Sequence, residues 1–141
     1  MNDMKRILIV DDDKRLTRLL RLNLGETGRF LVQEETVATS ALQTALSFMP
    51  DLILLDVMMP DMDGGDVAAQ IRAHPNLCHV PIVFLTAAAK KAEITDHQGH
   101  IGGMPFLAKP VDIDELTECL ARNLHTGSEQ SAQNADTSSG G

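Results

Sequence analysis

A short apolar run that ends on a carboxylate constrains the fold of this chain more than any other stretch. The four apolar residues 52–55 lie between Pro50 and Pro60 and lead directly into Asp56. A continuously apolar run of this length predicts a strand that is covered on both faces, as in a parallel sheet packed between helices. Ligand sites of open α/β sheets lie at the carboxyl ends of the strands, so Asp56 is a candidate functional residue. A single acid at a strand end is also typical of a turn or a helix cap, so the case for chemistry depends on its neighbours.

Polar side chains follow three other expected strands at the point where each strand ends. The expected strands and the polar residues after them are 5–10 with Asp11, Asp12 and Asp13, 82–85 with Thr86, and 106–108 with Lys109, and a shorter strand is expected at 30–32. The carboxyl ends of parallel strands lie at one edge of a sheet, so these side chains are expected to converge near Asp56. A purely structural origin for such a set is much less plausible than a functional site.

Helical patterns alternate with these strands. Leucines at 16, 19, 20 and 24 fall on one face of a helix that Gly25 is placed to end. The helices expected from such patterns are 14–24, 38–49, 65–73 and a last one capped by Asp112, and a short or poorly ordered helix is expected within 87–103. Strands that alternate with helices predict an α/β fold, with three layers (α/β/α) and a five-stranded parallel sheet.

The 141 residues have room for one domain with a sizeable core, and 43% of them are hydrophobic. We expect this domain to span residues 4–125. Residues 126–141 are mostly small and polar and have almost nothing to bury, so they are expected to form a disordered tail.

Composition argues against several classes of protein. No apolar run approaches the roughly 20 residues that a membrane span needs, and the N-terminus lacks the plan of a signal peptide, so a cytoplasmic protein without membrane contact is expected. The net charge of −8 argues against a nucleic-acid interface. Cys78 and Cys119 lack the spacing of a metal knuckle and are expected to be reduced thiols.

The converging acids indicate a divalent cation. Carboxylates that lie close together repel each other, and a hard cation relieves this repulsion by taking oxygen ligands. Mg²⁺ is the natural candidate, because it binds through one or two carboxylates and commonly bridges to a phosphate. Asp56 would then be free to attack phosphorus, while Lys109 neutralises charge on the phosphoryl oxygens and Thr86 donates a hydrogen bond to them.

At this point the sequence resembles the receiver domains of two-component response regulators, of the single-domain chemotaxis-regulator type. The resemblance covers about residues 4–125 and rests on four motifs in a specific order and spacing. These are Ile7-Leu8-Ile9-Val10-Asp11-Asp12-Asp13, the stretch from Asp56 through Met59-Pro60 to Asp63-Gly64, Phe84-Leu85-Thr86-Ala87, and Phe106-Leu107-Ala108-Lys109-Pro110. The resemblance implies a flavodoxin-like sheet with strand order 2-1-3-4-5.

The resemblance also implies a role for each site residue. Asp56 would be the phosphoacceptor, and Mg²⁺ would be held by Asp12, Asp56 and the backbone carbonyl of Met58, with Asp11 acting directly or through water. Lys109 would pair with the phosphate, next to a cis peptide before Pro110. Thr86 and Phe106 would form a switch pair that changes the face made by the fourth helix, fifth strand and fifth helix.

The implied function is that of a phosphoacceptor response regulator in a phosphorelay, which at most catalyses its own phosphorylation and dephosphorylation and is otherwise no enzyme. The donor would be a histidine kinase or a histidine phosphotransfer protein. No output domain follows in the sequence, so the response is expected to travel through contact with a downstream protein target, from a monomer or a phosphorylation-dependent dimer. Met58 is apolar two residues after the acceptor, for which we expect slow self-dephosphorylation.

Two departures from the family pattern concern the output face. Receivers usually carry a bulkier apolar residue where this chain has Gly65, and a single Gly-Ala pair where it has Gly102-Gly103-Met104-Pro105. Fast hydrogen exchange is therefore expected across residues 90–105.

Three other interpretations stay open. A pseudo-receiver would bind partners without phosphate chemistry. The acids at 11–13 also resemble the D-x-D motif of haloacid-dehalogenase-type phosphatases, although Arg15 stands where that family has Thr or Val. His97 and His100 could share a helix face and bind zinc, but surface histidines explain them better.

Overall fold

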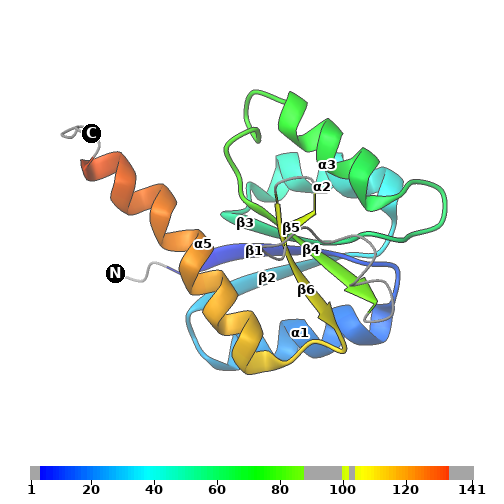
Figure 1. Cartoon of the computed structure of the whole chain (residues 1–141), viewed down its shortest axis with the longest axis horizontal. Coiled ribbons are helices and arrows are strands. Elements are labelled where there is room, and N and C mark those ends of the chain that lie inside the picture. Colours follow the sequence, from blue (N-terminus) through cyan, green and yellow to red (C-terminus); the bar gives the residue numbers. More distant parts are fainter. Residues whose placement is uncertain (1–3, 88–99, 102–103, 134–141) are drawn as a thin grey trace.

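The computed structural model has a parallel sheet of five strands with helices on both faces (Figure 1). It describes residues 4–87, 100–101 and 104–133, with side chains for 4–87 and 104–124. The strands are β1 (Lys5–Val10), β2 (Phe30–Glu35), β3 (Leu52–Asp56), β4 (Ile82–Ala87), β5 (His100–Ile101) and β6 (Met104–Lys109). The helices are α1 (Lys14–Glu26), α2 (Ala41–Phe48), α3 (Gly64–Ala73) and α5 (Ile113–Gln133), with a 3-10 turn at Ala38–Ser40.

The strand order confirms the predicted topology. The sheet runs β2-β1-β3-β4-β6, and all of these neighbours are parallel. β6 is thus the fifth strand of the predicted 2-1-3-4-5 order. The two-residue β5 was not predicted, and it pairs antiparallel with β6 at the edge of the sheet.

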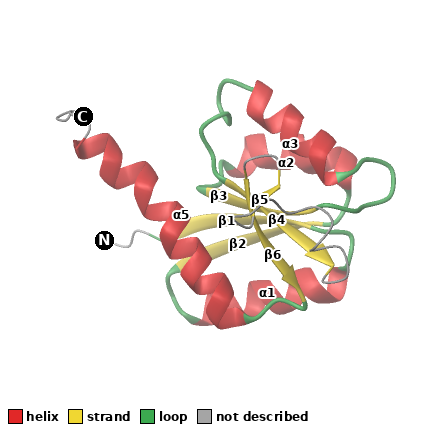
Figure 2. Cartoon of the chain, in the orientation of Figure 1, coloured by secondary structure: helices red, strands yellow, loops and turns green. Residues whose placement is uncertain are grey.

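Alternate residues of the buried strands supply two separate cores. On one face Leu8, Ile53 and Phe84 pack with residues of α2 and α3, and on the other Ile7, Leu54 and Leu85 pack with residues of α1 and α5. Figure 2 shows these pairs of helices on opposite sides of the sheet. All five residues of β3 are buried, so the predicted two-sided burial of this strand is confirmed. Burial of each large aliphatic side chain contributes about 1.5–3 kcal/mol, which fixes the central strand firmly.

The first helix differs from the prediction at its end and on one face. Gly25 does not end α1, because the helix continues to Glu26 and Thr27 caps it, donating its Oγ1 hydrogen to the carbonyl of Leu24 at 2.8 Å. Gly28, with φ of +76°, takes the left-handed conformation that often follows a helix end. Leu19 was assigned to the buried face with the other leucines, but its side chain is exposed.

Two other segments also differ from the pattern-based expectations. The second strand extends to Glu35 instead of ending at Val32, because its backbone pairs with β1 along its whole length. The expected helix at 38–49 is divided into the 3-10 turn and α2, which ends at Met49 in a left-handed conformation.

The last helix is capped as predicted but is longer than expected. Asp112 Oδ2 accepts the Glu115 N–H at 3.0 Å, and Leu116 and Leu120 are buried. The helix continues to Gln133, past residue 125, so the first part of the segment expected to be irregular is helical here. The rest of the expected tail (134–141) and the segment 88–99, which holds most of the expected fourth helix, lie outside the described residues.

Candidate functional site

Three strands bring acids and an amine together at one edge of the sheet. Asp11 directly follows β1, Asp56 is the last residue of β3, and Lys109 is the last residue of β6. β1 and β6 lie on either side of the β3–β4 pair, and the parallel register aligns their carboxyl ends. The predicted convergence of these residues is therefore confirmed.

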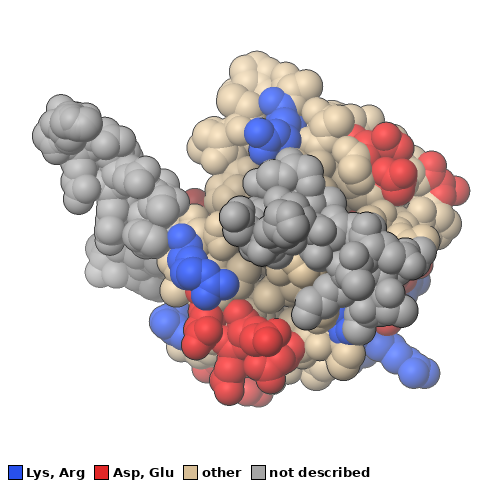
Figure 3. All heavy atoms as spheres, viewed as in Figure 1, with Lys and Arg blue, Asp and Glu red and all other residues tan. Residues whose placement is uncertain are grey.

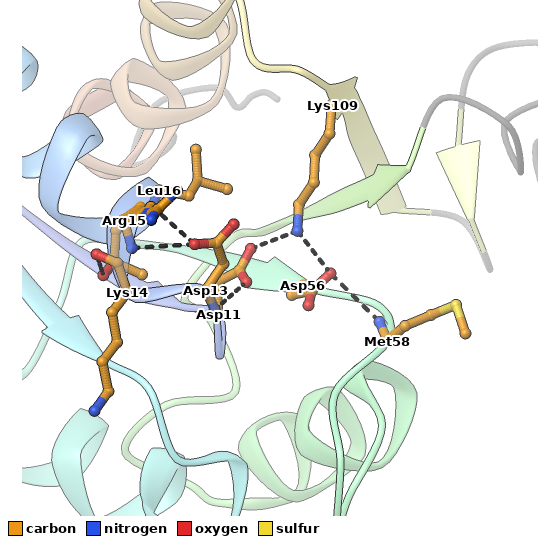
Figure 4. Close-up of polar contacts among 9 residues, drawn as sticks. Asp11, Asp13, Lys14, Arg15, Leu16, Asp56, Met58 and Lys109 are labelled. Carbon is orange, nitrogen blue, oxygen red and sulfur yellow. Dashed lines mark hydrogen bonds and ion pairs between the residues drawn. The ribbon is translucent and has the colours of Figure 1, made fainter.

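Lys109 reaches across the sheet edge to both buried carboxylates. Its Nζ lies 2.8 Å from Asp11 Oδ2 and 3.3 Å from Asp56 Oδ1. Figure 4 shows the ammonium group between the two acids. Asp11 is fully buried and Asp56 is 5% exposed, so the two charges share one cation in a poorly solvated place.

The segment after β1 is held by its own carboxylates. Asp11 Oδ1 accepts the Asp13 N–H at 2.9 Å, and Asp13 Oδ1 in turn accepts the N–H groups of Arg15 and Leu16. Asp13 is thus the N-cap of α1, a role that the sequence analysis did not assign although an Asp just before an amphipathic helix is its usual signal. Asp12 lies between the two and is exposed, so its side chain is free for a ligand.

Burial and repulsion make Asp56 a weakly acidic carboxyl. Burial is the largest cause, and the charge of Asp11 adds to it, while Lys109 and the Met58 N–H act in the opposite direction. Together they raise the pKa of Asp56 to about 6. Near neutral pH the carboxyl is therefore ionised, although burial and the charge of Asp11 disfavour its charged form.

Burial and the two carboxylates shift the pKa of Lys109 in opposite directions. Burial alone would lower the pKa of this amine, but the hydrogen bond and charge of Asp11, and then those of Asp56, outweigh it. The pKa of Lys109 lies above its ordinary value, so the amine is charged at neutral pH.

The loop after Asp56 is packed against the end of β3 by a glycine. The Gly64 N–H donates to the Val57 carbonyl at 2.8 Å. A Cβ on Gly64 would lie 2.3 Å from the Asp56 carbonyl oxygen and 2.9 Å from Val57 Cα, so no other residue fits without a backbone shift. Within the loop, the Met58 N–H donates to Asp56 Oδ1 at 3.4 Å. Gly64 therefore brings the loop close to the Asp56 carboxylate.

The donor set fits a hard divalent cation. Asp11, Asp12 and Asp56 each offer a carboxylate oxygen, and these atoms lie within 4.8 Å of one another. Oxygen ligands of this kind suit Mg²⁺. Among the described residues this is the one cluster of this type, while His97 and the side chain of His100, which raised the question of zinc, lie outside the described part.

The two expected switch residues lie on neighbouring strands. Thr86 is buried near the end of β4, one residue after Leu85, which pairs with Asp56. Phe106 of β6 pairs with Phe84 and is partly buried against the core shared with α2 and α3. The structure thus places Thr86 next to the site edge and Phe106 further down the adjacent strand.

A pocket lies beside the site, and Gly65 forms part of its lining. A pocket of about 520 Å³ lies next to the β3–α3 loop, and its described lining consists of Val57, Met58, Met59, Pro60, Asp63, Gly65 and Phe84. The resemblance implies a bulkier apolar residue at position 65, so the lining includes one of the two departures noted in the sequence. Met58 is 56% exposed, so an apolar side chain stands in solvent two residues from Asp56.

Within the described residues no helix combines the length and apolar character that crossing a bilayer requires. On the face drawn in Figure 3 the described basic side chains form small separate groups and no continuous basic patch.

The cis peptide implied before Pro110 is present between Lys109 and Pro110. With this fold and site in place, comparison with known proteins gives a consistent result. The chain matches the model of the response regulator receiver domain over residues 7–121.

Individual relatives agree with this match. The chain is 36% identical over 115 residues to the DNA-binding dual master transcriptional regulator RpaA of Synechocystis, covering 80% of this chain and 46% of that protein. It is 39% identical over 120 residues to the response regulator PleD of Caulobacter vibrioides, covering 84% of this chain and 26% of that protein. The chain thus spans less than half of either relative.

A solved structure shows the same fold. The crystal structure of a chemotaxis protein of Vibrio cholerae superposes with a TM-score of 0.72 and 27% sequence identity, covering 86% of this chain and all of that one. The match over residues 7–121 and the shared fold together show that this chain belongs to the response regulator receiver domain family of two-component systems.

Proposed function

We propose that Asp56 accepts a phosphoryl group from a phosphohistidine of a histidine kinase or a histidine phosphotransfer protein, and that residues 4–125 form the signalling unit, acting in the cytoplasm. The observation that carries this proposal is the position of Asp56 at the end of the central strand, with Asp11, Asp12 and Lys109 around it. Family membership supports the same chemistry.

The two oxygens of Asp56 have different surroundings that suit them to different tasks. Oδ1 is held by Lys109 and by the Met58 N–H, while Oδ2 accepts no hydrogen bond from the described residues. In the proposed step Oδ2 attacks phosphorus, the P–N bond to the histidine breaks, and its electron pair goes to the imidazole nitrogen. The product is an aspartyl phosphate and a neutral histidine.

Each neighbour has a defined part in this step. Lys109 would neutralise charge on the phosphoryl oxygens, and Thr86, one residue after the strand partner of Asp56, would donate a hydrogen bond to them after transfer. Asp11, Asp12 and Asp56, with the Met58 carbonyl, would hold Mg²⁺, which when bound supplies positive charge that compensates the phosphoryl group.

The signal would leave the site through Thr86 and Phe106. Movement of the Thr86 hydroxyl toward the phosphoryl group would vacate space next to the strand on which Phe106 lies, and the ring would turn inward. The altered face would contact a downstream protein target, from a monomer or a phosphorylation-dependent dimer.

Labelling with acetyl phosphate tests the acceptor directly. We expect the wild-type chain to gain the mass of one phosphoryl group in the presence of Mg²⁺, and Asp56→Asn to gain none. Asp61→Asn is the matched control, because it makes the same chemical change in the same loop at a residue with φ of +72°, which Asn tolerates. Asp12→Asn should retain the acceptor but need more Mg²⁺ for the same rate.

Two results would contradict the proposal. A wild-type chain that stays unlabelled by acetyl phosphate and by every phosphohistidine donor would indicate a phosphate-independent binding module. Label that persists in Asp56→Asn and disappears in Asp11→Asn would indicate the phosphatase-like alternative.

A further inference from the structure

β2 forms an open edge of the sheet. It pairs with β1 on one side, and no strand of the described structure lies on its other side. Open edges present unpaired backbone groups to which another strand can add, and proteins usually protect them with Pro, Lys or a bulge. The six residues of β2 include neither Pro nor Lys, and they pair with β1 in unbroken register. Leu31 and Gln33 are exposed on this strand, so the edge is accessible to a further strand.

The bonds to β1 show which backbone groups of β2 face outward. The Glu35 carbonyl accepts the Asp11 N–H at 3.1 Å, so it points toward β1. Because backbone groups alternate in direction along a strand, the N–H and C=O groups at even positions point away from β1. These positions are Phe30, Val32 and Glu34. The Gln33 side-chain amide donates to the Glu34 carbonyl at 3.3 Å, in the place where an added strand would donate.

The two ends of β2 carry opposite charges that lack an ion pair. Arg29 is exposed just before the strand, and Glu35 is its last residue. Glu35 accepts the Thr44 hydroxyl and the Val37 N–H, but within the described part of the chain no ion pair involves Glu35 or Arg29. A cation at one end and an acid at the other make this edge complementary to an antiparallel copy of itself.

A hollow beside the edge has room for an apolar side chain. It lies between β2 and α2 with a volume of about 420 Å³, and its described lining consists of Gln33, Gln43, Thr44, Ser47 and Phe48. Leu31 is on the same face of β2 as Gln33 and is 47% exposed. The edge therefore offers both an exposed leucine and a place next to Gln33 that a second leucine could fill.

We propose that two copies of this chain associate through β2, as antiparallel neighbours around a two-fold axis at Val32, so that their sheets join into one. Arg29 of each copy then stands opposite Glu35 of the other, and Leu31 of each copy stands opposite Gln33, next to the hollow. The outward N–H and C=O groups of the two Val32 residues pair with each other. This inference does not depend on the proposed phosphoryl chemistry.

The charges favour this register over its neighbours. The nearest registers that keep the outward backbone groups paired place Arg29 opposite Gln33 or Val37, and they leave Glu35 without a cation. The register centred on Val32 also pairs the whole length of the strand. It is therefore the arrangement that satisfies both the backbone and the two charges.

The antiparallel arrangement leaves both proposed phosphorylation sites open. Because the two β2 strands run in opposite directions, the carboxyl ends of the two sets of strands lie at opposite ends of the joined sheet. The two Asp56 residues are then far apart, and association needs no phosphoryl group. Asp56→Asn should dimerise within about twofold of the wild type.

Sedimentation velocity of the 141-residue chain over a range of concentrations measures the association. One six-residue strand gives a small interface, so we expect a dissociation constant of about 10–100 μM. Arg29→Glu and Glu35→Arg should each weaken association by about tenfold, because like charges then face each other at both ends of the strand pair. Arg72→Glu makes a matched charge change on α3 and should stay within about twofold of the wild type.

A mixture of the two charge variants tests the register itself. In a mixed dimer of Arg29→Glu with Glu35→Arg, each introduced charge faces an opposite charge of the other copy. The equimolar mixture should therefore associate within about threefold of the wild type, although each variant alone is weakened. A general effect of charge, or a loss of folding in one variant, would not produce this recovery.

Cross-linking reports the same register beside the hollow. Directly opposite residues of an antiparallel pair without mutual hydrogen bonds have Cα atoms about 4.5 Å apart, which a disulfide can span. The exposed Cys78 is first changed to Ser, while Cys119 is buried and can stay. On mild oxidation, a mixture of Leu31→Cys with Gln33→Cys should form a covalent dimer faster than either variant alone.

Three results would overturn this inference. They are a chain that stays monomeric up to about 1 mM, a dimer that Arg29→Glu does not weaken, and a variant mixture that associates no better than its components. A dimer that forms only after labelling by acetyl phosphate would also overturn it, and would leave the proposal for Asp56 intact.

Discussion

Lys109 is closer to Asp11 than to Asp56, with 2.8 Å between its Nζ and Asp11 Oδ2 and 3.3 Å between Nζ and Asp56 Oδ1. Asp11 is fully buried, and this ion pair is what compensates the charge on its Oδ2. In this metal-free state the Lys109 amine therefore interacts more closely with Asp11 than with Asp56, the proposed acceptor. A cation between the carboxylates would free Lys109 for a phosphoryl group.

Lys109→Ala should therefore destabilise the metal-free protein. Removing one partner leaves Asp11 and Asp56 without their shared cation, and we expect a loss of about 2–4 kcal/mol in the free energy of unfolding at pH 7.5. Urea denaturation followed by circular dichroism measures this. Mg²⁺ at millimolar concentration should recover part of the loss, and Arg72→Ala on α3 should show less than about 0.5 kcal/mol. An equally small loss of unfolding free energy in Lys109→Ala and Arg72→Ala would show that the ion pairs of Lys109 do not stabilise the fold.

Asp56→Asn should have the opposite effect on stability. The folded-state pKa is raised from 3.8 to about 6, so the carboxyl favours folding fully below pH 4, and this contribution is lost as pH rises through 6. The variant should equal or fall below the wild type near pH 4 and exceed it by about 1–3 kcal/mol at pH 7.5 without Mg²⁺.

Chemical denaturation at a series of pH values measures this difference. Most of the change should fall between pH 4 and 6, and Mg²⁺ should stabilise the wild type more than the variant. If the difference in unfolding free energy between the wild type and Asp56→Asn does not vary with pH, the pKa of Asp56 is not raised in the folded state. The chain contains no Trp or Tyr, so circular dichroism is the suitable probe.

Gly64 and Gly65 form a natural pair for comparing a tight and an open position. An added Cβ at Gly64 meets the Asp56 carbonyl oxygen at 2.3 Å, while at Gly65 the nearest atom is Asp63 Oδ1 at 3.4 Å. We expect Gly64→Ala to displace the loop, to lower stability by about 2 kcal/mol or more and to slow labelling by acetyl phosphate.

Gly65→Ala should be neutral or slightly stabilising, because alanine favours a helix over glycine by about 1 kcal/mol. Thermal unfolding and acetyl phosphate labelling of both variants check this. Equal effects at the two positions would refute the close approach of Gly64 to β3.

Burial patterns alone predicted much of the fold. The apolar runs of β1, β3 and β4 can satisfy their side chains only between two helical layers, and the structure buries them in this way. The polar residues at the ends of β1, β3 and β6 then had to converge, so Asp11, Asp56 and Lys109 were found without knowledge of any contact.

The sequence pattern could not predict details that depend on tertiary contacts. Leu19 has the spacing of a core residue, and only the position of α1 on the sheet shows that it faces solvent. Gly25 has the residue type of a helix end, but the Thr27 hydroxyl allows two more residues of helix before Gly28. The preference of Lys109 for Asp11 depends on distances that strand order does not determine.

The complete burial of β3 has a mechanical consequence for signalling. Asp56 is the end of a strand whose five side chains are all buried and which has parallel neighbours on both sides, so this strand has little room to shift. If Asp56 accepts a phosphoryl group, the added charge would act first on the side chains next to it, namely Lys109 and Asp11. The proposed signal would then start at an enclosed strand and leave through the side chains around its end.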